Sequence, residues 1–536
     1  MRHLTWLLAV CVLISMAAFA DDEGHHHEEL TEAQVGTVNF PVSCSAAAQK
    51  QFQQGVALLH SFWYEQAQES FKAVAKNDPK CAMAHWGLAM SLWHQLWNHP
   101  DAAMIAKGMA EVNAATALHA KTQREKDYIA AMAAFYGDPA GRTYQERAEA
   151  YSAAMQKVYK SYPDDREGAA FYALSLLASE PDHDTTFANR KEAGAILEKL
   201  FVEEPNHPGV AHYLIHSYDR PQLAELGLPA ARRYAQIAPA APHALHMPSH
   251  IFARLGLWQD DIDSNLASIA ATQKTAAMGM GGGGHQYHAM DFLEYAYLQS
   301  GRDADAQHVI DEAKAMPAVK DTMYGDFDPR TYALATFPAR YDLELHHWAD
   351  AAKLPLVEGG SLGNDATIYW ARTIGAARTG DLTAAHDDLS DLDGVIKKLG
   401  EKKSEFGDSV KQDREEAEAW ILHAEGLDDK ATGMLRSVAE KEEAEGAEPL
   451  AIPAREMLAD MELEMHKADQ ALAEYQADLK FNPNRFNGLY GAASAAEAAG
   501  KTSEANAYYA QLVKVCAGSN SDRPELSRAK SLVAQK

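Results

Sequence analysis

Two short stretches in the middle of the chain decide the fold: AHYLIH at residues 211–216 and ALHMPSH at residues 244–250. Each holds a His-x-x-x-His pair, and the pairs are 34 residues apart, from 212 to 246 and from 216 to 250. Side chains four residues apart share one face of a helix. An offset of about 34 residues is the length of one unit of two antiparallel helices. The sequence therefore predicts stacked helix pairs whose corresponding faces carry four imidazoles.

The composition is that of a folded, soluble protein. The chain has 536 residues, of which 47% are hydrophobic and 23% charged, and this length is enough for a long repeat array. The formal net charge is −27, and no basic run offsets it. Because an acidic surface repels phosphate groups, we expect no nucleic-acid partner.

Residues 1–20 have the features of a secretory signal peptide. Arg2 supplies the positive charge, the following apolar run is too short to span a membrane stably, and Ala18-Phe19-Ala20 is a small-x-small cleavage site. We expect cleavage after Ala20 and a periplasmic or secreted protein. No other stretch is apolar enough to cross a bilayer, so we expect no membrane insertion.

The segment at residues 21–43 begins with His25, His26 and His27 between acidic residues. Such a polar terminus is expected to be disordered. Its histidines either scavenge transition metals or belong to a solvated tail without chemistry.

Three cysteines follow the signal peptide. An exported compartment permits disulfides, and Cys44 and Cys81 are 37 residues apart, which is close to one repeat. These two cysteines could therefore lie side by side at the starts of neighbouring helices, and we predict that they form a disulfide. Cys516 is then left as a free thiol.

Small, aromatic and proline residues recur at a characteristic spacing: Gly55, Tyr64, Ala67, Phe71 and Pro79. The glycine and the alanine are small where two helices would cross closely. The phenylalanine would fill the space between units, and the proline would stop the second helix. This spacing resembles the tetratricopeptide repeat family, whose unit is two antiparallel helices.

The resemblance covers nearly the whole chain after the signal peptide. It implies an all-α helix–turn–helix solenoid, wound as a right-handed superhelix, in an exported protein of bacterial type. We assign residues 44–400 to an N-terminal and central array with inserts, and residues 401–536 to C-terminal repeats. The glycine-rich insert at residues 278–285 is expected to be a flexible loop. The family's concave groove implies a protein or peptide partner.

In that family, ligand-contacting residues lie on the first helix of each unit, three and four residues apart. Mapped here, three adjacent units present these inner-face residues: His212, His216, His243, His246, His250, His288, Asp291 and Tyr295, with His285 at the loop end. Imidazole and carboxylate groups are ligands of divalent transition metals. We predict a site for zinc or copper, with the two His-x-x-x-His pairs as its main ligands and with His243, His288 and Asp291 next.

Two alternatives compete with a simple metal-binding role. The histidines could form an ordinary buried polar network with Tyr213, Tyr218, Asp219 and Asp291 inside a cell-envelope scaffold for other proteins. A metalloenzyme would need an open ligand position and a base, for which Asp291 and Glu294 are the candidates. The glutamate of a His-Glu-x-x-His protease motif is absent, which counts against hydrolysis.

Other residues on the expected inner face have simpler interpretations. Trp86, Met90, Trp93 and His94 form a helical stripe typical of a core, and His60 lies one repeat before His94. The loop Asp182-His183-Asp184 could add a ligand but is more typical of a surface loop. Arg340 could meet an anionic group or form a salt bridge.

Overall fold

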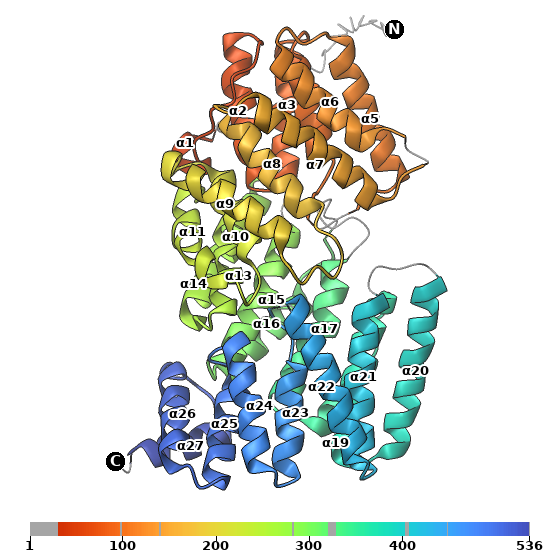
Figure 1. Cartoon of the computed structure of the whole chain (residues 1–536), viewed down its shortest axis with the longest axis vertical. Coiled ribbons are helices and arrows are strands. Elements are labelled where there is room, and N and C mark those ends of the chain that lie inside the picture. The colour runs from red at the N-terminus through yellow and green to blue at the C-terminus, as the bar shows by residue number, and fades with distance from the viewer. Residues whose placement is uncertain are drawn as a thin grey trace, which may run out of the picture.

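The computed structural model describes seven ranges of the chain: residues 30–96, 99–138, 141–280, 283–319, 328–401, 407–446 and 449–534. Within these ranges the protein consists of α-helices and connecting loops, without a strand. No helix in the described part is long and apolar enough to cross a membrane. Figure 1 shows an elongated stack of helix pairs.

The N-terminal part of the stack contains these helices: α1 (Glu32–Val35), α2 (Ala46–His60), α3 (Tyr64–Asn77), α4 (Ala82–Ser91), α5 (Ala102–Ala117), α6 (Gln123–Tyr136), α7 (Tyr144–Ser161), α8 (Arg166–Ala178) and α9 (Ala188–Glu203). The central part contains α10 (Pro208–Tyr218), α11 (Ala224–Ile237), α12 (Pro242–His246), α13 (Pro248–Arg254), α14 (Trp258–Ala277), α15 (Gly283–Gln299), α16 (Asp303–Ala315), α17 (Pro329–Glu344) and α18 (Trp348–Ala351).

The C-terminal part contains α19 (Leu362–Thr379), α20 (Leu382–Glu401), α21 (Gly407–Ala424), α22 (Asp428–Glu445), α23 (Ala454–Glu464), α24 (Ala468–Phe481), α25 (Phe486–Ala498), α26 (Thr502–Val515) and α27 (Pro524–Ala534). Consecutive helices pack as pairs along the whole chain, for example α2 with α3, α8 with α9 and α25 with α26. The predicted fold class, an all-α array of helix–turn–helix units, is confirmed.

The first unit shows why the repeat spacing produces this packing. A Cβ atom on Gly55 would lie 2.8 Å from the Phe71 ring, and one on Gly87 would lie 2.4 Å from it. The Phe71 ring therefore fills the space between α2 and α4, and only glycine leaves room for it on both sides. Several helices begin with a side-chain cap; Thr122 and Thr143 each form a capping box with a glutamate three residues later.

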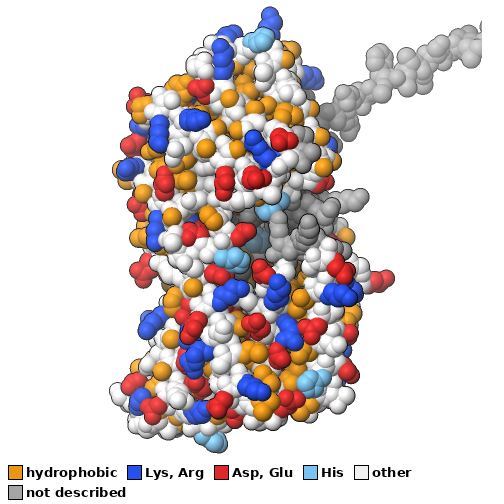
Figure 2. Space-filling model, turned by 45° about the vertical axis from the view of Figure 1, so that its right-hand side comes forward, with side chains coloured by type: hydrophobic (Ala, Val, Ile, Leu, Met, Phe, Trp, Pro, Cys, Tyr) orange, Lys and Arg blue, Asp and Glu red, His pale blue; other side chains and the backbone are white. Residues whose placement is uncertain are grey.

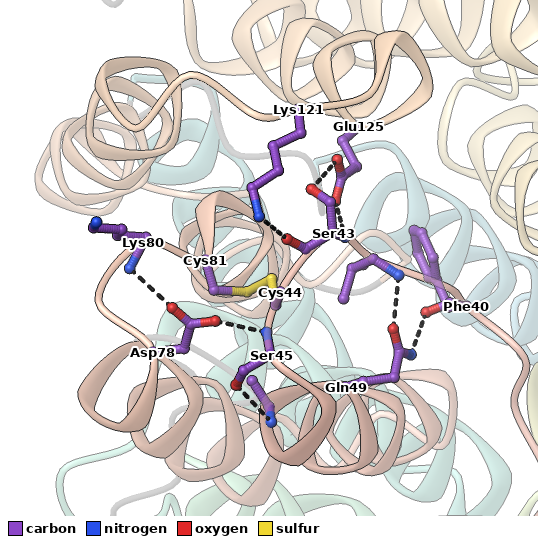
Figure 3. Close-up of a disulfide and its surroundings, with 12 residues drawn as sticks. Phe40, Ser43, Cys44, Ser45, Gln49, Asp78, Lys80, Cys81, Lys121 and Glu125 are labelled. Atoms are coloured by element: carbon purple, nitrogen blue, oxygen red, sulfur yellow. Dashed lines mark hydrogen bonds between the residues drawn. A yellow bond between two sulfur atoms is a disulfide. The ribbon is translucent and has the colours of Figure 1, made fainter.

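The predicted disulfide joins Cys44 and Cys81, whose Cα atoms are 5.0 Å apart (Figure 3). It ties the residue before the cap of α2 to the cap of α4. Asp78 accepts a hydrogen bond of 2.7 Å from the Ser45 backbone N–H beside it. Cys516 is a buried free thiol, as predicted.

Residues 30–43 correct the prediction that residues 21–43 are disordered. They contain α1, and Val35 and Phe40 are buried. The Gln49 side chain donates to the Phe40 carbonyl at 2.9 Å and accepts from the Val42 N–H at 2.8 Å (Figure 3). The segment begins with polar residues, and for that reason the apolar residues in its second part were not predicted to be buried. Residues 1–20, the predicted signal peptide, and residues 21–29 lie outside the described residues.

Two further local differences concern the centre of the chain. The glycine-rich segment at residues 278–285 is not a loop throughout, because α15 begins at Gly283 and includes His285. The second His-x-x-x-His pair spans two short helices instead of one. Pro248 has no N–H to donate to the carbonyl of the preceding turn, so α12 ends at His246 and α13 begins at Pro248.

The central helices lie between the N-terminal and the C-terminal parts of the stack (Figure 1). Near the C-terminus, the Trp258 indole N–H donates to the Asn484 carbonyl at 2.8 Å. Arg485 donates to the Tyr295 hydroxyl at 2.6 Å. Near the N-terminus, the Trp63 indole N–H donates to the Met280 carbonyl at 3.3 Å. The central helices α10 to α15 therefore contact units from both ends of the sequence.

Candidate metal centre

Seven histidines gather along the central helices α10, α12, α13 and α15. Six of them offer ligand nitrogens in two groups of three, and within each group the nitrogens lie within 4.8 Å of one another. The first cluster is His212, His216 and His243, and the second cluster is His246, His250 and His288. The seventh, His285, has its ring centroid 5.3 Å from that of His243.

The first cluster is built around His212. Its Nε2 lies 3.1 Å from Nε2 of both His216 and His243. Its Nδ1 lies 2.6 Å from the main-chain carbonyl of His60, at the end of α2. Because a carbonyl can only accept, the proton of neutral His212 sits on Nδ1. The Nε2 lone pair of His212 therefore points into the cluster.

The second cluster has two anchored imidazoles. His246 Nδ1 lies 2.7 Å from Oδ1 of Asn265, whose Nδ2 donates to the Asp261 carbonyl at 3.0 Å and so fixes the amide orientation. His250 Nδ1 lies 2.8 Å from a carboxylate oxygen of Asp219. Both Nδ1 atoms therefore donate, and the two Nε2 lone pairs face each other at 3.1 Å.

His288 completes the second cluster from α15. Its ring centroid lies 4.3 Å from that of His246 and 5.6 Å from that of His250. Phe292, one turn further along α15, packs against all three imidazoles, with centroid distances of 4.9, 4.5 and 5.5 Å to His246, His250 and His288. This apolar wall excludes water from one side of the cluster.

Burial keeps five of these imidazoles neutral. It lowers the pKa of His212 to about 3, and it lowers the pKa values of His216, His243, His246 and His288 well below the ordinary value. Neutral imidazole is the form that binds metals. Burial alone would raise the pKa of Asp219, but the Arg254 charge and the hydrogen bonds from Arg254 and His250 outweigh it, so that pKa is well below its usual range.

The predicted metal ligands thus separate into two adjacent clusters instead of converging on one point. His212 and His216 join His243, whereas His246 and His250 join His288. The clusters are neighbours: ring centroids of His243 and His246 are 6.0 Å apart, and those of His216 and His250 are 6.2 Å apart.

Asp291 does not join either cluster, although the sequence placed it among the ligands. Its carboxylate pairs with Arg340 and accepts from the Tyr332 hydroxyl at 3.1 Å. The same guanidinium lies 2.8 Å from Glu294, so Arg340 forms the salt bridge that was one of its two expected roles. The physical reason is helical rotation: α15 turns His288 toward α12 and α13, and it turns Asp291 toward α17.

A cavity of about 610 Å³ opens in front of the clusters. Three of the histidines line it: His216 of the first cluster and His250 and His288 of the second. Its charged lining residues are Glu180, Asp182, Arg190, Asp219 and Arg220. Histidine side chains are visible at mid-height of the molecule in Figure 2, on a face where acidic and basic side chains are interspersed. The clusters are therefore buried on most sides and accessible from this cavity.

A third group, His60, Glu167 and His207, also has metal-like spacing but is saturated with hydrogen bonds. Glu167 accepts from Nε2 of His60 at 2.8 Å and from Nε2 of His207 at 3.0 Å. The remaining ring nitrogens accept from the Tyr213 hydroxyl and from the Val210 N–H. Every ring nitrogen of His60 and His207 therefore has a hydrogen-bond partner, and the group needs no cation. Its hydrogen bonds hold α2, α8 and α10 together.

The groups that orient the ligands were not evident from the sequence pattern. Asp219 was considered only as part of a polar network, although it lies three residues after His216 and thus on the same helical side. Asn265 lies on α14, the second helix of its unit, whereas the family's ligand positions lie on first helices. The His60 carbonyl is a main-chain group without a sequence signal.

The remaining predicted candidates lie elsewhere. His183 pairs with Glu445 at 3.1 Å and does not reach the clusters, although its neighbour Asp182 lines the cavity. Trp86 and Trp93 are buried core residues, and His94 stacks on Tyr64 with a centroid distance of 4.1 Å. Tyr295 contacts Arg485. The histidines at 25–27 lie outside the described residues.

Comparison with known proteins gives little beyond the fold. No protein-family model matches the chain, and no curated protein shows significant similarity to it. Among solved structures, a human IFIT1 dimer with m7Gppp-AAAA aligns at 14% identity over 81% of this chain and 90% of that chain, with a TM-score of 0.34. A monomeric IFIT1 mutant with Gppp-AAAA aligns at 13% identity over 81% and 90%, with a TM-score of 0.38. Alignments at this level carry no information about what this protein binds.

Proposed function

We propose that this protein is an exported metal-binding protein. It holds a divalent transition-metal ion, zinc or copper, in three-histidine sites at the centre of an α-helical repeat array. The ligands are His212, His216 and His243 in the first cluster and His246, His250 and His288 in the second. The helical repeats serve as a rigid scaffold that holds ligands from four helices.

The observation that carries this proposal is the contact between His246 and His250. Their Nε2 atoms are 3.1 Å apart, and both Nδ1 atoms donate to oxygen acceptors. Two facing lone pairs repel unless a cation lies between them. A metal ion satisfies both nitrogens.

The spacing suits such an ion. Nitrogens bound at about 2.0–2.1 Å to a tetrahedral zinc ion lie about 3.3 Å from one another. The contacts of 3.1 Å within each cluster are close to this value. Each cluster also has the usual outer support, in which a ligand imidazole donates its other N–H to a carboxylate, carbonyl or amide oxygen. Asp219, the His60 carbonyl and Asn265 have this role.

Three ligands leave one tetrahedral position for another group. Structural zinc sites are normally closed by four protein ligands, whereas three nitrogen ligands are typical of sites that keep a position open. Here the open side faces the cavity, because His216, His250 and His288 line it. Imidazole-only donor sets suit both zinc and copper.

Export is part of this proposal. It rests on the predicted signal peptide, and the Cys44–Cys81 disulfide supports it, because disulfides persist in oxidising compartments and are rare in the cytosol.

The test is metal analysis of the mature protein purified without nickel resin. After chelation and dialysis, we expect isothermal titration and elemental analysis to show zinc or copper binding. Changing His212 and His216 to Asn, or His246 and His250 to Asn, should each abolish binding at one cluster while the other persists. His386→Asn is the control, because this exposed histidine lies on α20 and pairs with the Glu425 carboxylate.

If the chelated wild type binds none of the ions at a large excess, the proposal fails. The histidines would then be a structural polar network, and the protein would be a cell-envelope scaffold for protein partners. Pull-down of a partner that depends on the concave face, together with no metal uptake, would establish that alternative.

A further inference from the structure

We infer that the cavity in front of the two clusters takes a small oxygen anion as a shared co-ligand, and that a second divalent ion enters only together with this anion. The inference rests on the proposed metal binding. The anion is either hydroxide formed from a water molecule, whose proton goes to solvent, or a carboxylate or phosphate oxygen of a small molecule.

The charge of the site leaves a bound metal ion uncompensated. Six neutral imidazoles bring no charge to balance it. Among the described residues, the carboxylates of Glu180, Asp182 and Asp219 line the cavity. The guanidinium groups of Arg190 and Arg220 lie next to Glu180, and that of Arg254 lies next to Asp219. The formal charges of these three carboxylates and three guanidinium groups therefore sum to zero. They supply no net negative charge that could balance a bound metal ion.

The missing negative charge is important because the two clusters are close together. Rings from the two clusters approach to 6.0 and 6.2 Å between centroids. At a separation of this order, two divalent ions repel each other strongly. Even with the dielectric constant of water, this repulsion weakens binding of the second ion on the order of 100-fold, and a lower dielectric increases the effect. Two divalent ions cannot share the site tightly without an added negative charge.

The cavity has room for a ligand that supplies this charge. It has a volume of about 610 Å³ and reaches histidines of both clusters, so one ligand there can approach both ions. Arg190 is fully engaged, with Glu180 and with the His216 carbonyl. Arg220 is less engaged: its nearest carboxylate, on Glu180, is 3.9 Å away, and its buried Nε has no hydrogen-bond partner among the described residues. A guanidinium N–H without a hydrogen-bond partner is suited to donate a hydrogen bond to an oxygen of an anion.

A second cavity, which adjoins the first through His99 and Asp182, is another source of negative charge. It is lined by Asp408, Asp413, Glu416, Glu442 and Glu445. Burial raises the pKa of Glu442 to about 7, so part of this charge is neutralised. Water and salt screen the rest across the open cavity. These carboxylates therefore do not replace an anion between the two clusters.

The experiment is a zinc titration of the chelated full-length mature protein at pH 8, in a weakly coordinating buffer with perchlorate as counter-ion. Imidazoles are already neutral at this pH, so proton release followed by pH-stat reports ionisation of water. Parallel titrations contain 10 mM acetate or phosphate. We expect one tight equivalent first. A second equivalent should bind at least about 100-fold more weakly, unless acetate or phosphate is present or one proton is released with it.

Each outcome has a distinct meaning. Second-ion binding with proton release identifies hydroxide, and binding that requires acetate or phosphate identifies an oxyanion; both support the inference. Two tight equivalents without an anion and without proton release overturn it, as does a single equivalent under all conditions. Absence of any zinc binding instead refutes the proposed metal site itself.

A variant checks the role of the cavity wall. Arg220→Gln should raise the concentration of acetate or phosphate needed for the second equivalent by about 10-fold, because a charge-assisted hydrogen bond is lost. The first equivalent should be unchanged. Arg232→Gln is the matched control, since Arg232 is an exposed arginine paired with Asp260 away from the cavity. An equal effect of both variants, or of neither, contradicts the assignment of Arg220.

Discussion

At the scale of single residues, the site depends on which imidazole nitrogen carries the proton. Asp219 holds the proton of His250 on Nδ1 by accepting a hydrogen bond of 2.8 Å. Asp219→Asn keeps the shape of the side chain, but its amide can either donate or accept a hydrogen bond. His250 can then carry its proton on Nε2, which faces the cluster. We expect the zinc affinity of the second cluster to fall by about 10- to 100-fold, with the first cluster unchanged, as measured by competition with a chromogenic chelator.

The control for this variant is Asp388→Asn. Asp388 is also a buried carboxylate paired with an arginine, at 2.6 Å from Arg372, and it lies in α20 far along the chain from the histidines. It tests whether losing any buried ion pair lowers zinc affinity through general destabilisation. An equal loss of affinity in both variants would contradict the specific role of Asp219.

Helical periodicity makes some of the ligands predictable and leaves others ambiguous. The two His-x-x-x-His pairs were visible because residues four apart lie on one face of a helix. The third ligand of each cluster depends on the rotation of α12 and α15 about their axes. For that reason His243 and His288 were included among the ligands, but their assignment to separate clusters was not predicted, and Asp291 was placed in the wrong surroundings.

At the scale of helices, Gly209 sets how closely α10 approaches α2. A Cβ atom there would lie 2.4 Å from Nδ1 of His60, which is held by Glu167 and Tyr213. Gly209→Ala should therefore lower the free energy of unfolding by about 1–3 kcal/mol, because overpacking outweighs the better helix propensity of alanine. Urea denaturation followed by circular dichroism measures this change.

Gly433→Ala in α22 is expected to have the opposite effect on the free energy of unfolding. This glycine is inside a helix and exposed, and no atom lies within 4 Å of the place that a Cβ atom would take. Alanine should stabilise the protein by about 0.5–1 kcal/mol through helix propensity alone. If both variants shift stability in the same direction, close packing at Gly209 is not the deciding effect.

The helices themselves were the most predictable part of the structure. Helix α8 spans Arg166–Ala178, because small and large apolar residues there lie between an acidic loop and a polar insert. The break between α12 and α13 at Pro248 was not predicted. The short helix α1 was missed because its few apolar residues, such as Val35, carry no periodicity of their own and become buried only against distant units.

At the scale of the whole molecule, both ends of the array are fixed to its centre. Arg485 is fully buried and donates to Glu344 at 2.8 Å and to Glu456 at 2.7 Å, in addition to Tyr295. The contacts with Glu344 and Tyr295 join units about 140 to 190 residues apart, and they leave no periodic pattern in the sequence. For this reason the repeat spacing predicted the units but not how the ends would pack. The result is a rigid frame for ligands from four helices.

When the pH falls, the stability of the two halves of the molecule should change in opposite directions. In the histidine-rich half, burial lowers the pKa values of His60, His212, His216, His243, His246 and His288. The unfolded chain therefore binds protons that the folded one does not. Stability from these groups is fully present above about pH 6.5 and is lost as the pH falls below it, by up to about 1.4 kcal/mol per group and pH unit.

In the C-terminal half the sign is reversed. Burial raises the pKa values of Asp413, Glu442 and Asp460 to about 7. These groups bind protons in the folded state before the unfolded chain does. Their contribution to stability is present at low pH and is lost as the pH rises through about 7. Asp261 and Glu294, whose pKa values burial also raises, are exceptions within the histidine-rich half.

Hydrogen exchange measured by mass spectrometry separates the two effects. For the metal-free protein, going from pH 7.5 to pH 5.5 should reduce protection in α10 and α12 and increase it in α21 and α23, after correction for intrinsic exchange rates. Zinc added at pH 7.5 should increase protection only in the helices that carry the ligands, α10, α12, α13 and α15, because it binds the folded form of that half. Parallel changes in both halves would show that the ends are coupled so tightly that the array unfolds as one unit, and the local assignment of these buried groups would then be wrong.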